Sequence, residues 1–477
     1  MISRACLAIL LFLVIINVYL TTSQALHFEA LEVAKMESGA KGYVSDEVWY
    51  VNAARNILRK IFGLIPRMDI PRATLVYNNS IEVVKAEALA TAYNVKVLSS
   101  SFTKINALYV EAKSRNAIEQ FAKATNATDI VYGWILGDAE NINNYLNLEH
   151  PPMAKYLIAL AMVVFGDRPF FWRIPSIVMG ALLVVLTFLL VYEISRSEEL
   201  SLITTAFIAA DPMVKNLASI ALLDIHVATL TVLAIVLALR KKFKESVLMI
   251  SFASTFKFTA LIGFFPLIFL VIKNIAKKTK RFIDVFFEVL YYTLLLVVAF
   301  ILFQLLVSIP IVLSIGVGNW VRDSILGAIS WHLSVKCVGT ECPPASAPWD
   351  WFFGINAFPF YIEDGRTTSA AIGFVPAYTA CFLLMILSIP YMAIMKSKSR
   401  TAWYGVLGLF LGYVILWLAG SRTQYSFYAV QLTPFIYTYL VIQVRELIDR
   451  STLLKVFTSW YVVLSNLWGS VLKFFEE

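Results

Sequence analysis

Long apolar runs alternate with short basic loops along most of the chain. A helix needs about 20 residues to cross the hydrocarbon core of a bilayer, so runs of that order predict membrane-spanning helices. The first such run covers residues 5–20. The later ones cover residues 174–194, 200–213, 217–239, 246–256, 258–272, 285–315, 371–395, 402–419, 427–444 and 454–472. The pattern therefore predicts an α-helical polytopic membrane protein with about 11 transmembrane helices.

The basic loops predict the orientation of these helices, because short loops rich in Lys and Arg stay on the cytoplasmic side. Such loops lie at residues 240–244, 273–281, 396–400 and 445–450. With residues 23–152 outside, only one of the two short runs 153–165 and 200–213 crosses the membrane. We favour a surface-lying helix at 153–165, and the rival assignment stays open. The first run is favoured as a retained signal anchor over a signal peptide cleaved near residue 25.

Residues from about 73 to 135 have a different pattern, with moderate hydrophobicity and balanced charge. They predict a strand, a helix, a hairpin, a second helix and a final strand, the βαββαβ order of a ferredoxin-like unit. We expect this small α+β domain to be inserted on the extracytoplasmic side. Its Asn-X-Ser/Thr triplets make Asn78 and Asn126 candidates for glycosylation.

These patterns divide the chain into consecutive parts. The division is a first transmembrane helix at 1–22, an extracytoplasmic loop at 23–152 that holds the inserted domain, a transmembrane bundle at 153–315, a second extracytoplasmic loop at 316–370, and C-terminal transmembrane helices at 371–477.

Composition agrees with a membrane protein: of 477 residues, 59% are hydrophobic and 15% charged, and the mean hydropathy is +0.73. The net charge of +8 does not indicate nucleic-acid binding, because the basic residues lie in loops between apolar runs. The four cysteines form no metal-binding pattern. Cys337 and Cys342 share one polar loop, where a disulfide and two free thiols are both open interpretations.

Ionisable residues near the predicted helix ends gather on the outer side. They are Asp46, Glu47, Glu149, His150, Arg173, Asp211, Asp224, His226, Lys257 and Arg422. A charge within the hydrocarbon costs about 2.5–3.5 kcal/mol on insertion scales, so Asp224 and Lys257 need water or an opposite charge. We expect Asp224 to pair with a cation. Together these residues predict a polar site at the outer leaflet.

Several segments resemble, in order, the blocks of the protein O-mannosyltransferase (dolichyl-phosphate-mannose-protein mannosyltransferase) family, which has a GT-C-type fold. The segments are Ser45-Asp46-Glu47-Val48-Trp49-Tyr50, Leu148-Glu149-His150-Pro151-Pro152-Met153-Ala154-Lys155-Tyr156, Trp172-Arg173-Ile174-Pro175-Ser176, Ala221-Leu222-Leu223-Asp224, Phe256-Lys257-Phe258-Thr259-Ala260-Leu261 and Ser346-Ala347-Pro348-Trp349-Asp350-Trp351. Three features depart from the family pattern. The stretch 422–428 lacks a histidine, the outer loop after Ile315 is short, and the inserted domain is not expected.

The resemblance implies a sugar donor linked to polyprenyl or dolichyl phosphate, inverting transfer to Ser/Thr hydroxyls of proteins, and an active site outside a multi-pass cell membrane (the endoplasmic reticulum in a eukaryote). Asp46 is the expected base, and Glu47 supports it. Arg173, Arg422 and Lys257 are candidates for the leaving phosphate, with Arg173 matching the family better. Candidates for acceptor or donor binding also include Glu149, His150, Asp224, Trp349 and Trp351.

Other functions remain open at this point. A lipid acceptor, as in aminoarabinose-transferring relatives, fits the same residues. A transporter is a distant alternative, because no internal repeat is seen. We expect no cofactor and no metal ion, and the sequence does not indicate an oligomeric state.

Overall fold

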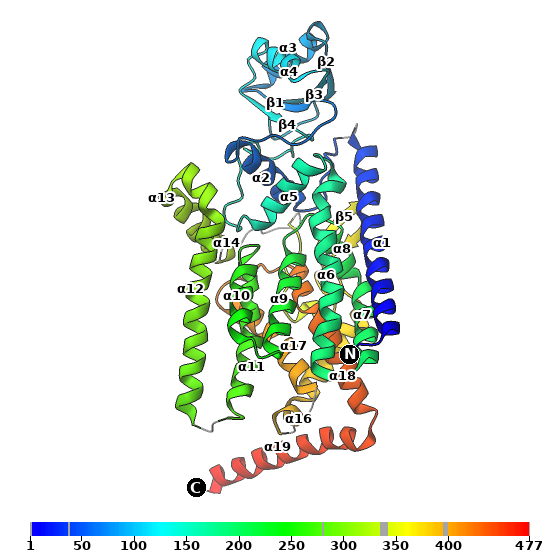
Figure 1. The fold of residues 1–477 in the computed structure, drawn as a ribbon, viewed down its shortest axis with the longest axis vertical. Helices are drawn as coiled ribbons and strands as arrows, with labels where there is room; N and C mark the ends of the chain where they lie inside the picture. Colours follow the sequence, from blue (N-terminus) through cyan, green and yellow to red (C-terminus); the bar gives the residue numbers. More distant parts are fainter. Residues whose placement is uncertain (1, 37–38, 279–280, 334–341, 395–398, 477) are drawn as a thin grey trace.

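The computed structural model describes residues 2–36, 39–278, 281–333, 342–394 and 399–476. It is an elongated bundle of helices with a small α+β domain on one end (Figure 1). Among the described residues, five helices are long and apolar enough to cross a membrane. They are α1 (Arg4–Ala34), α6 (Pro169–Ser195), the continuous η3–α11 segment (Phe258–Ile275), α12 (Phe282–Ile315) and α17 (Ser399–Leu418).

Shorter helices fill the space between the long ones (Figure 1). They are α7 (Glu198–Ala210), α8 (Pro212–Ala218), α9 (Asp224–Leu239), α10 (Phe243–Ala253), α15 (Val375–Leu387), α16 (Ile389–Ile394) and α18 (Thr433–Leu447). The predicted run 217–239 is interrupted, because residues 219–223 form a turn before α9 begins at Asp224. That interruption places a carboxylate at a helix start near the domain end of the bundle.

The last helix, α19 (Arg450–Glu476), lies across the bundle at the end opposite the α+β domain (Figure 1). The predicted span at 454–472 is therefore wrong. Apolar side chains recur along one stripe at Leu454, Phe457, Tyr461 and Trp468, all exposed, while Lys455 lies on another face. A one-sided stripe is typical of a helix that lies in an interface, whereas a spanning helix is apolar all round.

The inserted domain contains β1 (Arg72–Val76), α3 (Ser80–Leu89), β2 (Val95–Ser99), β3 (Ala107–Ala112), α4 (Arg115–Ala124) and β4 (Asp129–Tyr132). Its strands pair in the order β2-β3-β1-β4, and every pairing is antiparallel. This is the order of elements that the sequence predicts for 73–135. The sheet buries Leu75, Val110 and Phe121 under the two helices, and the side chains of Asn78 and Asn126 are exposed.

Two helices lie between the inserted domain and the bundle. Helix α2 (Glu47–Lys60) and helix α5 (Met153–Val164) lie together at the domain end (Figure 1). Near the C-terminal end of α2, Arg59 donates hydrogen bonds to Asp129 of β4, with Nη2 3.0 Å from Oδ2. Asn143 also donates to Asp129, at 2.9 Å. Helix α2 is thus bonded to the inserted domain at this end.

Acid is expected to weaken this junction. Burial opposes the charged form of Asp129, but the hydrogen bonds from Arg59 and Asn143 outweigh burial and lower the pKa of this carboxyl. The stabilisation is therefore present above the unfolded-state pKa of about 3.9 and is lost as the pH falls through the lower folded-state pKa. The protection factors of residues 129–143 against hydrogen exchange should be high at pH 5 and lower below pH 4. In Asp129→Asn this acid-induced change should disappear, and an unchanged response would contradict the assignment.

The short elements of the second loop complete the fold at the domain end. They are α13 (Val317–Trp320), the π-helical turn η4 (Val321–Leu326), α14 (Gly327–Leu333), the 3₁₀ turn η5 (Asp350–Phe352) and a two-stranded sheet of β5 (Pro359–Glu363) and β6 (Arg366–Ala370). A further 3₁₀ turn, η6 (Ser426–Gln431), precedes α18.

Candidate functional site

The two adjacent carboxylates at the start of α2 have different environments. Glu47 is completely buried and accepts two hydrogen bonds from Arg173, both at 2.8 Å. It also accepts from the backbone N–H groups of Val44 at 2.8 Å and Ala221 at 2.7 Å. The remaining Arg173 nitrogen, Nη1, donates to the carbonyl of Ala25 at 2.7 Å. Glu47 therefore joins α2 to α6 and to the turn before α9.

In this geometry Arg173 is the partner of Glu47, and its binding of the leaving phosphate stays a prediction. Each of its three guanidinium nitrogens donates to a protein oxygen, and its side chain has no exposed surface. A phosphate would have to displace Glu47, which would leave a buried carboxylate without its cation. The sequence shows that an arginine is present, but it does not show that each of its three nitrogens already donates to a protein oxygen.

Asp46 is the N-cap residue of α2 and is half-buried. The preceding residue, Ser45, has φ 56°, a left-handed conformation that is uncommon for a residue with a side chain. Such backbone positions cluster at functional sites. The positive end of the α2 dipole also favours the charged form of a carboxylate at this position.

Tyrosines from separate segments lie around Asp46. Burial, followed by the charges of Asp46 and Asp224, raises the pKa of Tyr50 well above its ordinary value. Burial and the charge of Asp46 likewise raise the pKa of Tyr425. Tyr50 thus lies within the electrostatic reach of both carboxylates, and Tyr425 brings the 422–428 stretch to the same place. The sequence analysis did not select either tyrosine; Tyr50 ends the acidic motif, and Tyr425 lies in the stretch that lacks the histidine.

Asp224 and Lys257 form a buried ion pair. Lys257 Nζ lies 2.8 Å and 3.0 Å from the two carboxylate oxygens of Asp224. The same ammonium lies 4.3 Å from the ring centroid of Tyr428 and 4.9 Å from that of Phe427, distances at which a cation is attracted to an aromatic face. The prediction that Asp224 pairs with a cation is confirmed.

Glu149 and His150 lie on the turn before α5. Glu149 accepts hydrogen bonds from the Tyr145 hydroxyl and from Asn147 Nδ2, the latter at 2.9 Å. The His150 ring packs edge-on against Tyr50, with centroids 5.6 Å apart. Buried Lys155 donates to the carbonyl oxygens of this turn, including that of His150 at 2.7 Å. Lys155 holds the turn in place, a role that the sequence analysis did not assign.

The second outer loop packs on the 422–428 stretch. Trp351 donates from Nε1 to Ser346 at 2.8 Å and lies edge-on to Tyr413. Trp349 packs on Trp417, and the Arg422 guanidinium lies 3.6 Å from the centroid of the Trp417 ring. Arg422 is exposed, and within the described residues no carboxylate forms a salt bridge with it. Arg422 is therefore available to an anion, whereas Arg173 is not.

An apolar groove of about 460 Å³ begins directly after Lys257. The lining residues include Phe258, Thr259, Ile262, Phe300, Ala328 and Leu416. Its walls come from η3, α12, α14 and α17. Phe258, which follows Lys257 in sequence, lines one wall of the groove, and Leu416 of α17, which ends shortly before Arg422, lines another. An amphiphile with an apolar chain and an anionic head matches that combination.

Metal ligands and cysteines were also part of the sequence predictions. Across the described ranges, no group of three or more His, Cys, Asp or Glu side chains is close enough to hold a metal ion. That the sugar transfer needs no metal ion stays a prediction. Cys342 is disulfide-bonded, and Cys337 lies outside the described residues.

Part of this chain is similar to a known family of membrane glycosyltransferases. Residues 149–307 match the model of a family described as dolichyl-phosphate-mannose-protein mannosyltransferase. The matched region contains Glu149, His150, Arg173, Asp224 and Lys257. The match agrees, over residues 149–307, with the family resemblance found in the sequence.

Proteins of Mycobacterium tuberculosis and one solved structure are also similar to this chain. Two strains of Mycobacterium tuberculosis, CDC 1551 / Oshkosh and ATCC 25618 / H37Rv, have a polyprenol-phosphate-mannose–protein mannosyltransferase that is 37% identical to this chain over 75 residues. The match covers 16% of this chain and 14% of the relative. Among solved structures, ArnT from Cupriavidus metallidurans bound to undecaprenyl phosphate aligns with 12% identity and a TM-score of 0.45 over 93% of this chain and 64% of that one.

Proposed function

We propose that this chain is an inverting glycosyltransferase that moves mannose or a related hexose from a polyprenyl-phosphate donor to Ser or Thr hydroxyls of proteins. One observation carries the proposal. It is the combination of Asp46 and Asp224, whose charges both act on Tyr50, with the Asp224–Lys257 ion pair. An apolar groove is lined from Phe258 onward, and residues 149–307 match the mannosyltransferase family. The three features supply a base, cationic surroundings and a place for a lipid chain.

In this mechanism Asp46 accepts the proton of the acceptor hydroxyl while its oxygen attacks the anomeric carbon of the sugar. The bond between that carbon and the phosphate oxygen breaks on the opposite face, and the polyprenyl phosphate leaves with the bonding electrons. Arg422, which is exposed, stabilises the charge that develops on the phosphate. Lys257 contributes through its ion pair with Asp224, which fixes the nearby aromatic rings. Glu47 does not contact the substrate, because its oxygens are already bonded to Arg173 and two backbone N–H groups.

The proposal is tested by purifying the full chain and supplying polyprenyl-phosphate sugars with Ser/Thr peptides. Transfer of mannose to a peptide, with inversion at the anomeric carbon, is the expected result. A lipid acceptor is the second candidate, since any hydroxyl placed near Asp46 meets the same chemistry. Transfer to lipid hydroxyls but not to peptides would replace the protein acceptor, and absence of transfer from every polyprenyl-phosphate sugar would reject the function.

The proposal places the site outside the membrane, at the end of the bundle that carries the inserted domain. The connection between α11 and α12 and the crosswise helix α19 lie at the other end (Figure 1), and both are basic in sequence. Single cysteines at Ser45 and Phe243 test this orientation with an impermeant thiol label. We expect labelling at position 45 only. Labelling at position 243 from outside would show that the orientation in the membrane is the reverse of the proposed one.

Replacing Arg422 by glutamine is expected to raise the KM for the donor. A hydrogen bond to a charged group contributes about 1.5–3 kcal/mol, which corresponds to roughly 10- to 150-fold in affinity. Arg366→Gln is a matched control, because Arg366 is an exposed arginine of β6. Equal donor KM values for the two variants would remove Arg422 from the phosphate site.

Narrowing the apolar groove is expected to discriminate between donors by chain length. In Ala328→Phe the added ring occupies part of the groove, so a long polyprenyl chain loses the burial of about two methylene groups, worth about 1.6 kcal/mol. The KM should rise about tenfold for a long-chain donor and stay unchanged for a short-chain donor. Leu326→Phe is the control, since Leu326 is exposed and not among the residues that line the groove. An equal effect on both donors would place the lipid chain elsewhere.

A further inference from the structure

Two buried ion pairs of opposite polarity join α2 to the start of α6. In the first, the acid Glu47 belongs to α2 and the base Arg173 to α6. In the second, the base Arg55 belongs to α2 and the acid Asp167 lies just before α6. All four side chains have no exposed surface. Helix α2 is therefore fixed at two points, eight residues apart along its length.

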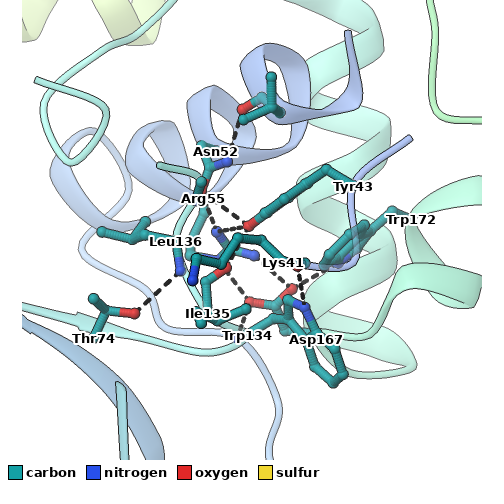
Figure 2. A network of polar contacts seen from close by, with 12 residues as sticks. Lys41, Tyr43, Asn52, Arg55, Thr74, Trp134, Ile135, Leu136, Asp167 and Trp172 are labelled. Carbon is teal, nitrogen blue, oxygen red and sulfur yellow. Dashed lines mark hydrogen bonds and ion pairs between the residues drawn. The ribbon is translucent and has the colours of Figure 1, made fainter. Parts of the chain in front are cut away.

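The second pair is the centre of a larger network, shown in Figure 2. Arg55 donates to the two carboxylate oxygens of Asp167 at 2.7 Å and 3.0 Å. Its remaining nitrogen, Nη1, donates to Asn52 at 2.7 Å. Asp167 also accepts from Trp172 Nε1 at 2.6 Å. The guanidinium and the carboxylate are thus bonded on every side, so the geometry of the pair is fixed.

The inserted α+β domain supplies part of this network. Directly after β4, the backbone N–H of Trp134 donates to Asp167 at 3.0 Å. The carbonyl of Ile135 accepts from the Tyr43 hydroxyl at 2.5 Å, and the indole of Trp134 donates to the carbonyl of Lys41 at 2.9 Å. The segment that leaves the domain therefore bonds to the segment before Asp46 and to the partner of Arg55 (Figure 2).

Stability alone does not explain such a network. Replacing a buried ion pair by apolar residues of similar volume is often neutral or stabilising, because the charges lose their hydration. What the pair provides is a fixed direction and distance between two elements. A misplacement of about 1 Å at a reacting group can cost a factor of about 10² in rate. Asp46 precedes α2 directly, so a rotation of this helix moves it.

We propose that the segment of the inserted domain that follows β4 braces α2, with Arg55 and Asp167 as positioning residues for Asp46. The inference rests on the proposed function for its kinetic consequence, though not for its structural one. It gives the inserted domain a role in the reaction without contact to donor or acceptor.

The test is the double replacement Arg55→Met with Asp167→Leu in the full chain, which removes both charges and keeps apolar volume. The matched control is Arg72→Met with Glu111→Leu, an ion pair inside the same domain that does not touch α2. We measure kcat, the donor KM, the unfolding temperature and hydrogen exchange of residues 47–60. For the Arg55/Asp167 variant we expect kcat to fall about 10- to 100-fold, with KM within about twofold and faster exchange in α2. The unfolding temperature should also fall, because the Trp134 N–H and Trp172 Nε1 lose their acceptor, so kcat is measured well below it. The control should change none of the kinetic values.

The outcomes separate the two proposals. Wild-type kcat and wild-type exchange in the folded double variant would overturn the brace. Equal loss of kcat in the control would also overturn it, because the effect would then belong to the domain as a whole. If wild-type protein transfers no sugar, the proposed function fails, while exchange of residues 47–60 still decides whether the pair fixes α2. If the double variant does not fold, Trp134→Phe is measured by the same readouts. It removes the hydrogen bond to the carbonyl of Lys41 and reduces the contact with Trp172, but keeps the backbone bond to Asp167.

Discussion

Replacing Asp46 by asparagine is expected to lower kcat for sugar transfer by about 10² to 10⁴, the usual contribution of a positioned general base. Asparagine keeps the shape of the side chain but cannot accept the proton of the acceptor hydroxyl. The donor KM should change little, because Asp46 acts on the acceptor side of the anomeric carbon. The measurement is the initial rate of transfer from polyprenyl-phosphate mannose to a Ser/Thr peptide at saturating concentrations of both.

Asp69→Asn is the matched control for this variant, since Asp69 is an exposed carboxylate on the segment after α2. It should transfer sugar at the wild-type rate. The unfolding temperature of Asp46→Asn should stay near that of the wild type because Asp46 is only half-buried. Undiminished turnover in correctly folded Asp46→Asn would remove Asp46 as the base and make another carboxylate near Tyr50, namely Asp224, the next to test.

The sequence predicted that Asp224 pairs with a cation for a reason that needs no structure, and the structure identifies that cation as Lys257. Two charges within apolar runs each cost several kcal/mol in hydrocarbon, so mutual pairing is the simplest solution. The partners of Arg173 could not be predicted, for the opposite reason. A family block shows which residue type is present, whereas the structure shows that all three nitrogens of Arg173 are already bonded. The hydrogen-bond partners depend on residues far away in the sequence, such as Glu47 and Ala25.

The elements of the fold also include some that the sequence predicted and some that it did not. The inserted domain was predictable because its strands and helices have distinct periods, and the observed order of elements is the predicted one. Helix α19 was mistaken for a span because its length and apolar content were considered without the direction in which its apolar residues point. The brace around Arg55 was missed because its partners, Asp167, Trp134 and Tyr43, come from segments without a shared motif.

Replacing Arg173 by leucine is expected to cost about 3–5 kcal/mol of stability, because Glu47 would remain buried without its cation. Glu47→Gln leaves the arginine charge unpaired in the same place and should also destabilise strongly. The measurement is the free energy of unfolding in detergent, with Arg366→Leu as the control, since Arg366 is an exposed arginine of β6. The double variant Glu47→Gln with Arg173→Leu should be less destabilised than the sum of the two single variants.

This experiment also decides between two roles for Arg173. A structural partner of Glu47 gives a strong coupling free energy between the two substitutions and a loss of folded protein. A phosphate ligand would give Arg173→Leu near-normal stability, a raised donor KM and no coupling with Glu47 in unfolding. The second pattern would place Arg173 in the phosphate site. The first would leave Arg422 as the cation for the leaving group and make Glu47 the residue that holds α2, and with it Asp46, against α6.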